Sequence, residues 1–312
     1  MKQARPLLCA LWLLPAIWTA PAYSLQAPPD ASQTSSEAQT AALVRAFELI
    51  SDGKLKKAKA EIDRAAAMTE EPCGECLLGL SHISAAEEKW NEAVDAAQRA
   101  IPLLKSPGLL ARAYNQLGIA NARLNTRDSL TKAESALRKG ADIGGAWGEM
   151  ARYNLAELLL RQAKWAEAAE AAQRYLQEAG PDGTALKEAR VLLCRARGAL
   201  PYEASWEPGE NPEVKRVGGE VLRPEILFQT KPEYPEAARR ARIQGTVIVE
   251  AIIDEAGCVR AVRVLEEVSH GLTESAVQAV RNWVFLPATL AGEPVKVYYV
   301  LTVSYSVSGT SF

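Results

Sequence analysis

The sequence predicts a multidomain α+β protein, in which an all-α array of helical repeats precedes a small α+β domain. The first observation is a motif that recurs about every 35 residues within an alanine-rich stretch from 41 to 200. The second is the pattern of the last ninety or so residues, which indicates helix, strand, strand, helix, strand. At 312 residues the chain is long enough for two domains.

The repeat is clearest where Lys89–Ala93 recurs as Lys164–Ala168, with weaker copies at 53–58 and 130–133. Each copy ends on an alanine, at intervals of 35, 40 and 35 residues: Ala58, Ala93, Ala133 and Ala168. Seven positions further on, three of the four residues are small: Ala65, Ala100, Gly140 and Tyr175. Small residues at both places would let the two helices of a hairpin approach closely.

This pattern resembles the tetratricopeptide repeat, whose period is about 34 residues. The first helices of the copies carry steps similar to that family's Leu-Gly pair: Leu78-Gly79, Leu117-Gly118 and Leu155-Ala156. The resemblance implies four helix pairs, with residues 186–199 as a terminal helix that caps the last apolar face. It also implies a curved scaffold that binds a peptide or another protein. Arg112 and Asn115 are our candidates for its groove, with solvated surface as the alternative.

The last domain, expected at 223–308, can be divided into elements from its residues. Pro235 suits the first turn of a helix, and Gly245 is expected to end that helix and begin a strand. The turn residues Asp254–Gly257 separate two β-branched runs, which predicts a hairpin. One apolar stripe then follows helical spacing: Leu272, Ala276, Ala279, Val280 and Trp283. A long strand at 295–307 would complete an antiparallel sheet covered by helices.

The same segment resembles the C-terminal domain of the TonB energy-transducer family. The matching residues span the segment in the family's order: Tyr234-Pro235, Ala237-Ala238, Ile243, Gly245, Asp254, Gly257, Val262, Val264, Ala276, Ala279-Val280, Trp283, Phe285, Pro287-Ala288, Gly292 and Pro294-Val295. The resemblance implies that the last strand is a sheet edge. This edge would accept an extended segment, the TonB box of an outer-membrane transporter, by β-augmentation.

The candidate partner-binding residues follow from that resemblance. They lie on the last strand and just before the helix expected to start at Pro235: Lys231, Tyr234, Val297, Tyr298, Tyr299, Val300 and Leu301. Alternate side chains of the strand are expected to pack on the helices, so the backbone would carry the binding: Val295, Val297, Tyr299, Leu301, Val303 and Tyr305. Some members of the family carry Gln where Lys231 stands, so the partner's identity stays open.

The N-terminus has the pattern of a targeting segment. Lys2 and Arg5 precede an apolar run, and Ala20–Ala22 is typical of a cleavage site. We therefore expect a signal peptide at 1–24 and a periplasmic protein, with a retained inner-membrane anchor as the alternative. A disordered leader at 25–40, the repeats at 41–200 and a linker at 201–222 would precede the last domain.

The chain also departs from the family. Its apolar N-terminal run carries no histidine, and the long proline-rich arm is missing. Coupling to an inner-membrane proton-channel motor would need either a retained anchor or a partner held by the repeats. The first hypothesis is thus a transducer that supports import of siderophores or similar nutrients. The alternative is a non-energised scaffold for envelope assembly.

The sequence shows no Ser, His and Asp constellation and no Gly-rich loop between a strand and a helix. We therefore expect that the protein is not an enzyme and binds no cofactor. The net charge of −2 gives no attraction to nucleic acid. Cys73 and Cys76 form the one chemical motif, with a local structural disulfide or a redox pair as its interpretations. A zinc site would need two further ligands from Cys194, Cys258 or His82, and no spacing favours it.

Overall fold

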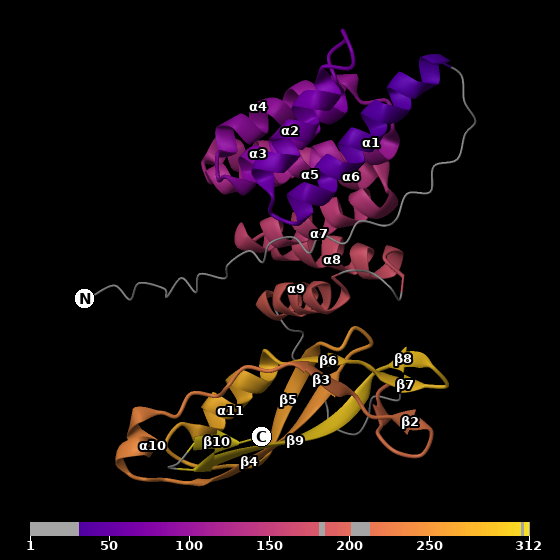
Figure 1. The fold of residues 1–312 in the computed structure, drawn as a ribbon. Coiled ribbons are helices and arrows are strands. Elements are labelled where there is room, and N and C mark those ends of the chain that lie inside the picture. Colours follow the sequence, from indigo (N-terminus) through magenta and orange to yellow (C-terminus); the bar gives the residue numbers. More distant parts are fainter. Residues whose placement is uncertain (1–30, 181–184, 201–212, 307–308, 312) are drawn as a thin grey trace. The chain divides into compact units, whose positions relative to one another are not determined.

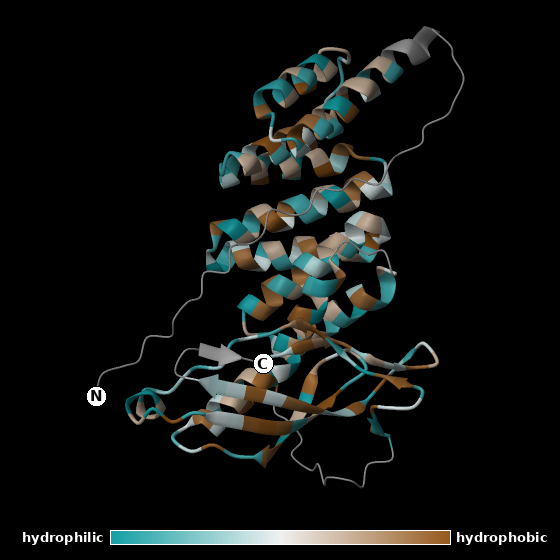
Figure 2. Cartoon of the chain, turned by 60° about the horizontal axis from the view of Figure 1, so that its bottom comes forward, coloured by the Kyte–Doolittle hydropathy of each residue, from teal (hydrophilic) through white to brown (hydrophobic). Residues whose placement is uncertain are grey.

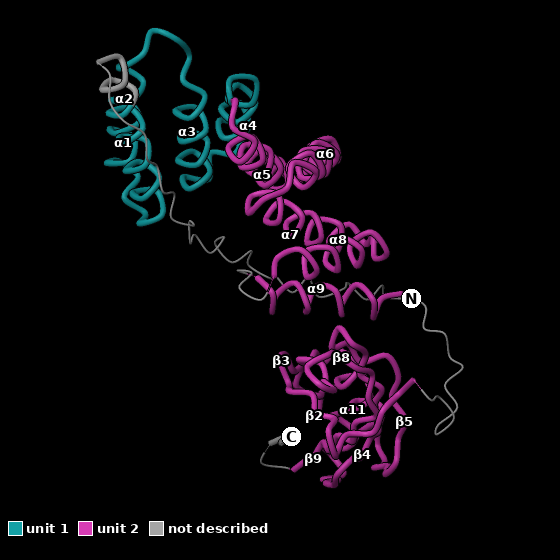
Figure 3. The backbone as a smooth tube through the Cα atoms, turned by 90° about the vertical axis from the view of Figure 1, so that its right-hand side faces the viewer, with its two compact units in different colours: residues 1–104 teal, residues 105–312 magenta. Residues whose placement is uncertain are grey.

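The computed structural model describes residues 31–180, 185–200, 213–306 and 309–311. The chain divides into two compact units, residues 1–104 and residues 105–312 (Figure 3). The predicted fold class is confirmed: paired helices make up the N-terminal part and an α+β domain the C-terminal part (Figure 1). The second unit contains both the later helix pairs and the sheet domain.

The first unit holds two helix pairs. Its elements are α1 (Ala31–Ser51), α2 (Leu55–Ala66), α3 (Gly74–Ala86), α4 (Trp90–Ala100) and the 3₁₀ helix η1 (Ile101–Leu103). Helix α1 begins earlier than the sequence predicted, since alanine, glutamine and glutamate in the expected leader all favour helix. The expected signal peptide lies outside the described residues. Within the described ranges, no helix combines the length and apolar character that a membrane span requires.

The second unit continues with five helices, which form two pairs and a final single helix. They are α5 (Pro107–Leu124), α6 (Arg127–Ile143), α7 (Gly145–Arg161), α8 (Trp165–Glu178) and α9 (Leu186–Ala199). Thr126 caps α6 by accepting the backbone N–H of Ser129, while the Ser129 hydroxyl accepts the N–H of Thr126. Leucines and alanines of α6 to α9 share one buried core, so α9 covers the last apolar face as predicted.

Close approach within the pairs explains the small residues of the repeat. The four alanines of the motif are 2 % exposed or less: Ala58, Ala93, Ala133 and Ala168. A Cβ on Gly118 would lie 2.4 Å from Cγ of Leu137, so this step of α5 tolerates only glycine without movement of that leucine. Tyr175, the one large residue seven positions on, is buried, and its hydroxyl accepts the N–H of Ala185 at 3.0 Å.

The C-terminal domain has one long sheet and two small ones. Its strands are β1 (Lys215–Arg216), β2 (Val221–Leu222), β3 (Glu225–Phe228), β4 (Gly245–Ile253), β5 (Val259–Glu266), β6 (Val284–Leu286), β7 (Ala288–Leu290), β8 (Glu293–Val295), β9 (Val297–Ser306) and β10 (Gly309–Ser311). The long sheet has the order β1-β9-β4-β5, with β10 also on β9. The order β2-β7-β8 forms a second sheet, and β3 pairs with β6. Both β1 and β2 lie in the range expected as linker.

Two helices complete the domain, α10 (Glu236–Arg240) and α11 (Leu272–Arg281). The predicted apolar stripe is confirmed, because all five of its residues are buried and belong to the domain core or lie beside it. Figure 2 shows that apolar residues are frequent along the long strands. The prediction for Gly245 was right for the strand, which begins there, and wrong for the end of the helix. Helix α10 ends at Arg240 and Arg242 takes the left-handed φ of 52°, whereas Gly245 starts β4 against Val268.

Candidate functional site

Strand β9 carries most of the predicted partner-binding residues. Its alternate side chains Val297, Leu301, Val303 and Tyr305 are buried in the domain core, which confirms the expectation that this face packs against the helices. The Tyr305 hydroxyl donates to the carbonyl of Leu272 at 3.1 Å, and burial raises the pKa of this tyrosine. These four side chains are therefore unavailable to a partner. Tyr299, on the same face, is only partly buried and packs against Phe285 beside the core. Contacts with a partner must use the backbone, the exposed part of Tyr299 or the opposite face.

One edge of β9 is paired along nearly its whole length, whereas the other is paired only at its ends. Strand β4 pairs with β9 from Val297 to Tyr305. On the other edge, β1 pairs in parallel with Val297 and Tyr298, and β10 pairs antiparallel with residues 304–306. Between them, Tyr299–Val303 has no second strand partner in the described part of the chain. We call these five residues the open stretch.

The direction of the backbone groups in the open stretch follows from one hydrogen bond. The N–H of Lys215 donates to the carbonyl of Lys296 at 2.8 Å, so the backbone of Lys296 faces β1. Backbone groups of successive residues in a strand point to opposite edges. The N–H and C=O groups of Val300 and Thr302 therefore point away from β4, toward the edge of β9 on which β1 and β10 lie. The Val300 side chain is 52 % exposed, so no other part of the described chain covers this residue fully, and a partner can reach it.

Strand β1 is held on β9 by side chains on the sheet face away from the helices. Val214 lies in a small buried cluster with Ile252, Ala261 and Tyr298. The Arg216 guanidinium lies 5.3 Å from the centroid of the Tyr298 ring. Because β1 occupies this end of the edge, the backbone edge at Val297 and Tyr298 is engaged within the chain. The edge expected to be free over the whole strand is free only in the open stretch.

The segment that precedes α10 is fixed to α11 and to Trp283, just after that helix, by three hydrogen bonds. The Trp283 indole donates to the carbonyl of Thr230 at 3.0 Å, and the Thr230 hydroxyl donates to Ala279. The Ser275 hydroxyl donates to the carbonyl of Glu233. Lys231, which lies between these anchors, is exposed. Its exposure leaves it available for a polar contact.

Tyr234 joins this segment to the core next to β9. Its ring packs edge-on against Tyr305 with centroids 5.7 Å apart, and its hydroxyl donates to the carbonyl of Ile243. The structure therefore brings Tyr234 together with β9, through the buried face of the strand. A structural role accounts for these contacts of Tyr234, and its contact with a partner stays a prediction.

The C-terminal domain is similar in sequence to known proteins. Residues 230–307 match the family model of the Gram-negative bacterial TonB protein C-terminal domain. Protein TonB of Vibrio cholerae serotype O1 is 32 % identical over 85 residues, which cover 27 % of this chain and 35 % of that protein. Protein TonB of Yersinia enterocolitica is 37 % identical over 89 residues, which cover 28 % and 32 %. The matched region thus spans about a third of the length of these relatives.

Solved structures similar to the chain include two proteins. The crystal structure of MamA protein has a TM-score of 0.39 and 18 % identity, covering 53 % of this chain and 83 % of that one. A thermophilic TPR protein of Thermus thermophilus has a TM-score of 0.41 and 16 % identity, covering 51 % and 80 %. The assignment of helical repeats rests on the helix pairs and spacing of this chain itself.

The candidate groove residues of the repeats lie on α5 and contact α7. Arg112 is 9 % exposed and Asn115 is 5 % exposed, so the alternative of solvated surface was wrong. The Arg112 guanidinium lies 4.5 Å from the centroid of the Trp147 ring, and burial lowers its pKa to about 10. Asn115 accepts a hydrogen bond of 2.8 Å from Asn154. These contacts join two helices, and ligand binding by either residue stays a prediction.

The Cys73–Cys76 motif forms a disulfide at the start of α3. Cys73 is the N-cap residue of this helix, and its sulfur accepts the N–H of Cys76 at 3.1 Å. Cys76 is buried in the core of the first unit. Across the described ranges, no group of three or more His, Cys, Asp or Glu residues could hold a metal ion.

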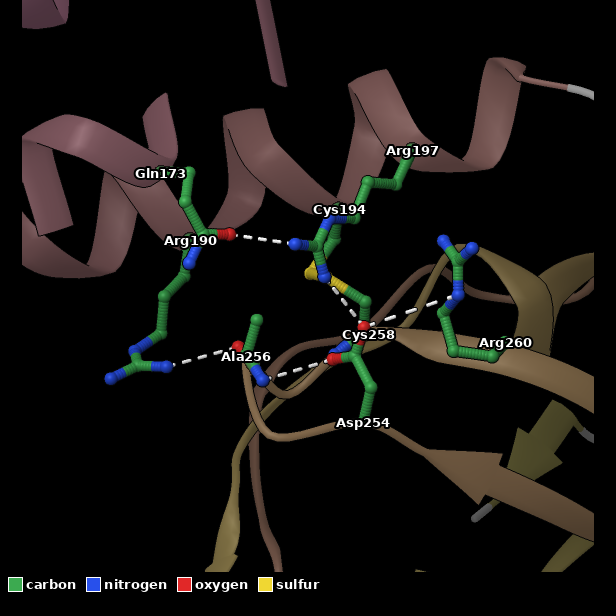
Figure 4. Close-up of a disulfide and its surroundings, with 8 residues drawn as sticks. All are labelled: Gln173, Arg190, Cys194, Arg197, Asp254, Ala256, Cys258 and Arg260. Atoms are coloured by element: carbon green, nitrogen blue, oxygen red, sulfur yellow. Dashed lines mark hydrogen bonds and ion pairs between the residues drawn. A yellow bond between two sulfur atoms is a disulfide. The ribbon is translucent and has the colours of Figure 1, made fainter. Parts of the chain in front are cut away.

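A second disulfide, Cys194–Cys258, joins α9 of the repeats to the start of β5 in the TonB-like domain (Figure 4). From the sequence, these two cysteines were expected at most as zinc ligands. Cysteine pairing by elimination could have found the bond, because these two remain once Cys73 pairs with Cys76 and Cys9 is assigned to the signal peptide. The 64 residues between them hid the pairing from any local pattern.

Proposed function

We propose that this chain is a periplasmic protein of TonB type, whose C-terminal domain binds the TonB box of an outer-membrane transporter by β-augmentation. In this role it supports energy-dependent import of siderophores or similar nutrients. The open stretch of β9 carries the proposal, because its unpaired backbone groups offer the hydrogen bonds that an added strand needs. The family match at 230–307 supports the assignment of this domain.

The helical repeats dock a second protein in this proposal. Stacked helix pairs present the same face of each first helix side by side, which suits a long partner segment. In the second unit, Glu157 of α7 interacts electrostatically with Arg123 of α5 and Arg195 of α9. Both arginines are exposed, so a partner can reach them for polar contacts. No catalytic role is proposed for either domain.

Replacement of Val300 by proline tests the docking edge. Proline removes the Val300 N–H, which an added strand would use. It leaves the hydrogen bonds to β4 in place, since the backbone of Val300 points away from β4. The control is Val300→Thr, which keeps the N–H and the β-branched shape. A synthetic peptide carrying the TonB box of a transporter from the same host should bind V300P at least about tenfold more weakly than V300T, since a hydrogen bond and the space for the strand are lost.

Equal affinities of V300P and V300T would reject the open stretch as the docking edge. Thermal unfolding of both variants shows whether proline has disturbed the domain. If V300P does not fold, cysteine cross-linking decides: Val300→Cys should form a disulfide with cysteine at one register of the peptide. Cross-linking at every register, or at none, would contradict the proposal.

The same edge would serve a non-energised scaffold if no link to an inner-membrane energy source exists. The mass and the cell fraction of the mature chain from its native host distinguish these functions. An intact Met1 in the inner-membrane fraction would support the transducer. A soluble periplasmic chain that starts near Tyr23 or Leu25 would favour the scaffold, because direct coupling to the inner-membrane motor would then be missing.

A further inference from the structure

The turn between β4 and β5 contacts the last helix of the repeats around the Cys194–Cys258 disulfide (Figure 4). Cys258 is 1 % exposed and belongs to the apolar core that α6 to α9 share, although it lies in the sheet domain. Ala256, in the same turn, packs against that core as well. The turn thus completes the core of the repeats, and the disulfide makes the contact covalent.

Two arginines of α9 flank the disulfide, one turn of helix to either side of Cys194. Arg190 donates to the carbonyl of Ala256 at 2.9 Å. Arg197 donates to Asp254 at 2.7 Å and, with its other nitrogen, to Gln173 of α8 at 2.6 Å. Arg197 therefore connects two helices of the repeats to one carboxylate of the sheet domain.

That carboxylate also organises the turn it belongs to. Asp254 is 3 % exposed, and its second oxygen accepts the N–H groups of Ala256 at 3.0 Å and Cys258 at 2.9 Å. A buried carboxylate with all of these partners is costly to remove, because its donors would be left unpaired. Asp254 holds the turn in the shape that presents Cys258 to α9.

The turn is equally fixed to its own domain. The N–H of Phe285 in β6 donates to the carbonyl of Gly257 at 2.9 Å. A Cβ on Gly257 would lie only 1.8 Å from the Phe285 carbonyl oxygen, which shows how closely the two segments pack. Strand β4, which begins the hairpin, pairs along its length with β9. A rigid path therefore runs from α9 through the turn and β4 to the open stretch.

We infer that Cys194–Cys258, Arg190, Arg197 and Asp254 form a clasp that makes α9 part of the rigid body of the sheet domain, so that force on the repeats reaches β9 through the clasp and bypasses residues 201–212. The inference holds whatever either domain binds, and it goes beyond the proposed docking function. For a chain that pulls on a partner, the clasp supplies a direct connection between α9 and the sheet domain. Reduction of the disulfide would release the covalent part of that connection.

Cleavage of the bypassed segment tests the covalent connection in the full chain. A specific protease site is introduced within 201–212, and the chain is cut without reductant. On a denaturing gel the two fragments should remain one species and should separate when dithiothreitol is added. The variant Cys194→Ser with Cys258→Ser should separate without reductant. Separation of the chain that keeps both cysteines, without reductant, would overturn the clasp.

Single-molecule stretching tests the mechanical part. Handles attached in α5 and at the end of β9 apply force to the full chain. In the double-serine variant, rupture of the contact should release residues 201–212 at low force and add up to about 40 Å, at roughly 3.4 Å per extended residue. The parent chain should lack this step. The control Cys73→Ser with Cys76→Ser, which removes the other disulfide, should behave like the parent.

An early step of the same length in the parent chain would overturn the inference, because load would then pass through 201–212. If the double-serine variant does not fold, the parent chain stretched with and without dithiothreitol supplies the same comparison. The docking function is tested by peptide binding at Val300, so failure of one proposal is distinguishable from failure of the other.

Discussion

Arg216 of β1 reaches over β9 to the buried carboxylate of Glu250 on β4, with 3.5 Å between its Nη1 and Oε1. The same carboxylate accepts from Arg263 of β5 at 2.7 Å. Glu250 is 4 % exposed, and its buried charge is stabilised by two arginines from the first and last strands of the order β1-β9-β4-β5. The pair Arg216 and Glu250 fixes where β1 lies and therefore where the open stretch begins.

Arg216→Ala should release β1 from β9. The variant loses the contact with Glu250 and the stacking on Tyr298, whereas Arg263 still pairs with the carboxylate. Contacts of this kind contribute about 1 kcal/mol together, so the backbone amide of Tyr298 should exchange its hydrogen about five- to tenfold faster. Hydrogen exchange measured by NMR gives this rate.

The matched control for that experiment is Arg223→Ala, which removes the same charge from an exposed side chain. Its Tyr298 amide should exchange at the parent rate. If both variants exchange at the parent rate, Arg216 does not hold β1, and the limit of the open stretch would need another explanation. Faster exchange in R216A should also be accompanied by tighter peptide binding, since two more residues of the edge become available.

Gly257→Ala should be far more destabilising than Gly292→Ala. Both glycines have nearly the same left-handed φ, 86° and 88°, so alanine suffers the same backbone strain of about 1 kcal/mol at each. At Gly257 the new Cβ would also meet the Phe285 carbonyl oxygen, whereas nothing lies within 4 Å at Gly292. The clash should add about 2 kcal/mol or more. Calorimetric unfolding of both variants measures it, and equal losses would contradict the close packing of the turn on β6.

Periodic features of this fold could be predicted from the sequence. The stripe from Leu272 to Trp283 identified α11 because a buried helix face repeats every 3.6 residues. Asp254 and Gly257 identified the hairpin, since the turn needs a left-handed residue and a side chain that accepts backbone N–H groups. Motif spacing gave the helix pairs in the same way.

Features that depend on distant contacts could not be predicted. Lys215 and Arg216 are held as a strand by contacts with distant residues, Lys296, Glu250 and Tyr298, and a run of two residues has no period. Arg112 was expected at the surface or in a groove, but the Trp147 ring buries it in a place that no local pattern shows. The limits of the docking edge were missed for the same reason. They depend on β1 and β10, which pair with the two ends of β9 and leave no pattern in the sequence of β9 itself.

Tyr175→Phe should destabilise the second unit by about 1 to 2 kcal/mol, because the buried N–H of Ala185 loses its acceptor. The control is Tyr114→Phe, which keeps the aromatic ring beside Lys139 and should cost less than about 0.5 kcal/mol. Thermal unfolding of both variants gives the difference. An equal, small loss in both would show that the Tyr175 hydroxyl does not satisfy Ala185.

Glu157→Gln should change the pH dependence of stability. Burial raises the pKa of Glu157 above its ordinary value of 4.5, although Arg161, Arg123 and Arg195 act in the opposite direction. A raised pKa means that the folded chain holds the proton more tightly than the unfolded chain. The resulting stabilisation is fully present below pH 4.5 and is lost as the pH rises through the folded pKa. Glutamine stays neutral, so E157Q should gain stability relative to the parent at pH 7 and little at pH 4.

Glu134→Gln should show the opposite dependence and serves as the control. Burial would raise the pKa of Glu134, but hydrogen bonds from Lys164 and Arg138 outweigh it and lower the pKa. The stabilisation is therefore present above pH 4.5 and is lost as the pH falls through the folded pKa. E134Q should be less stable than the parent at pH 7 and converge with it in acid. Unfolding by urea from pH 3 to pH 8 compares the two variants, and parallel curves would refute the different environments of these carboxylates.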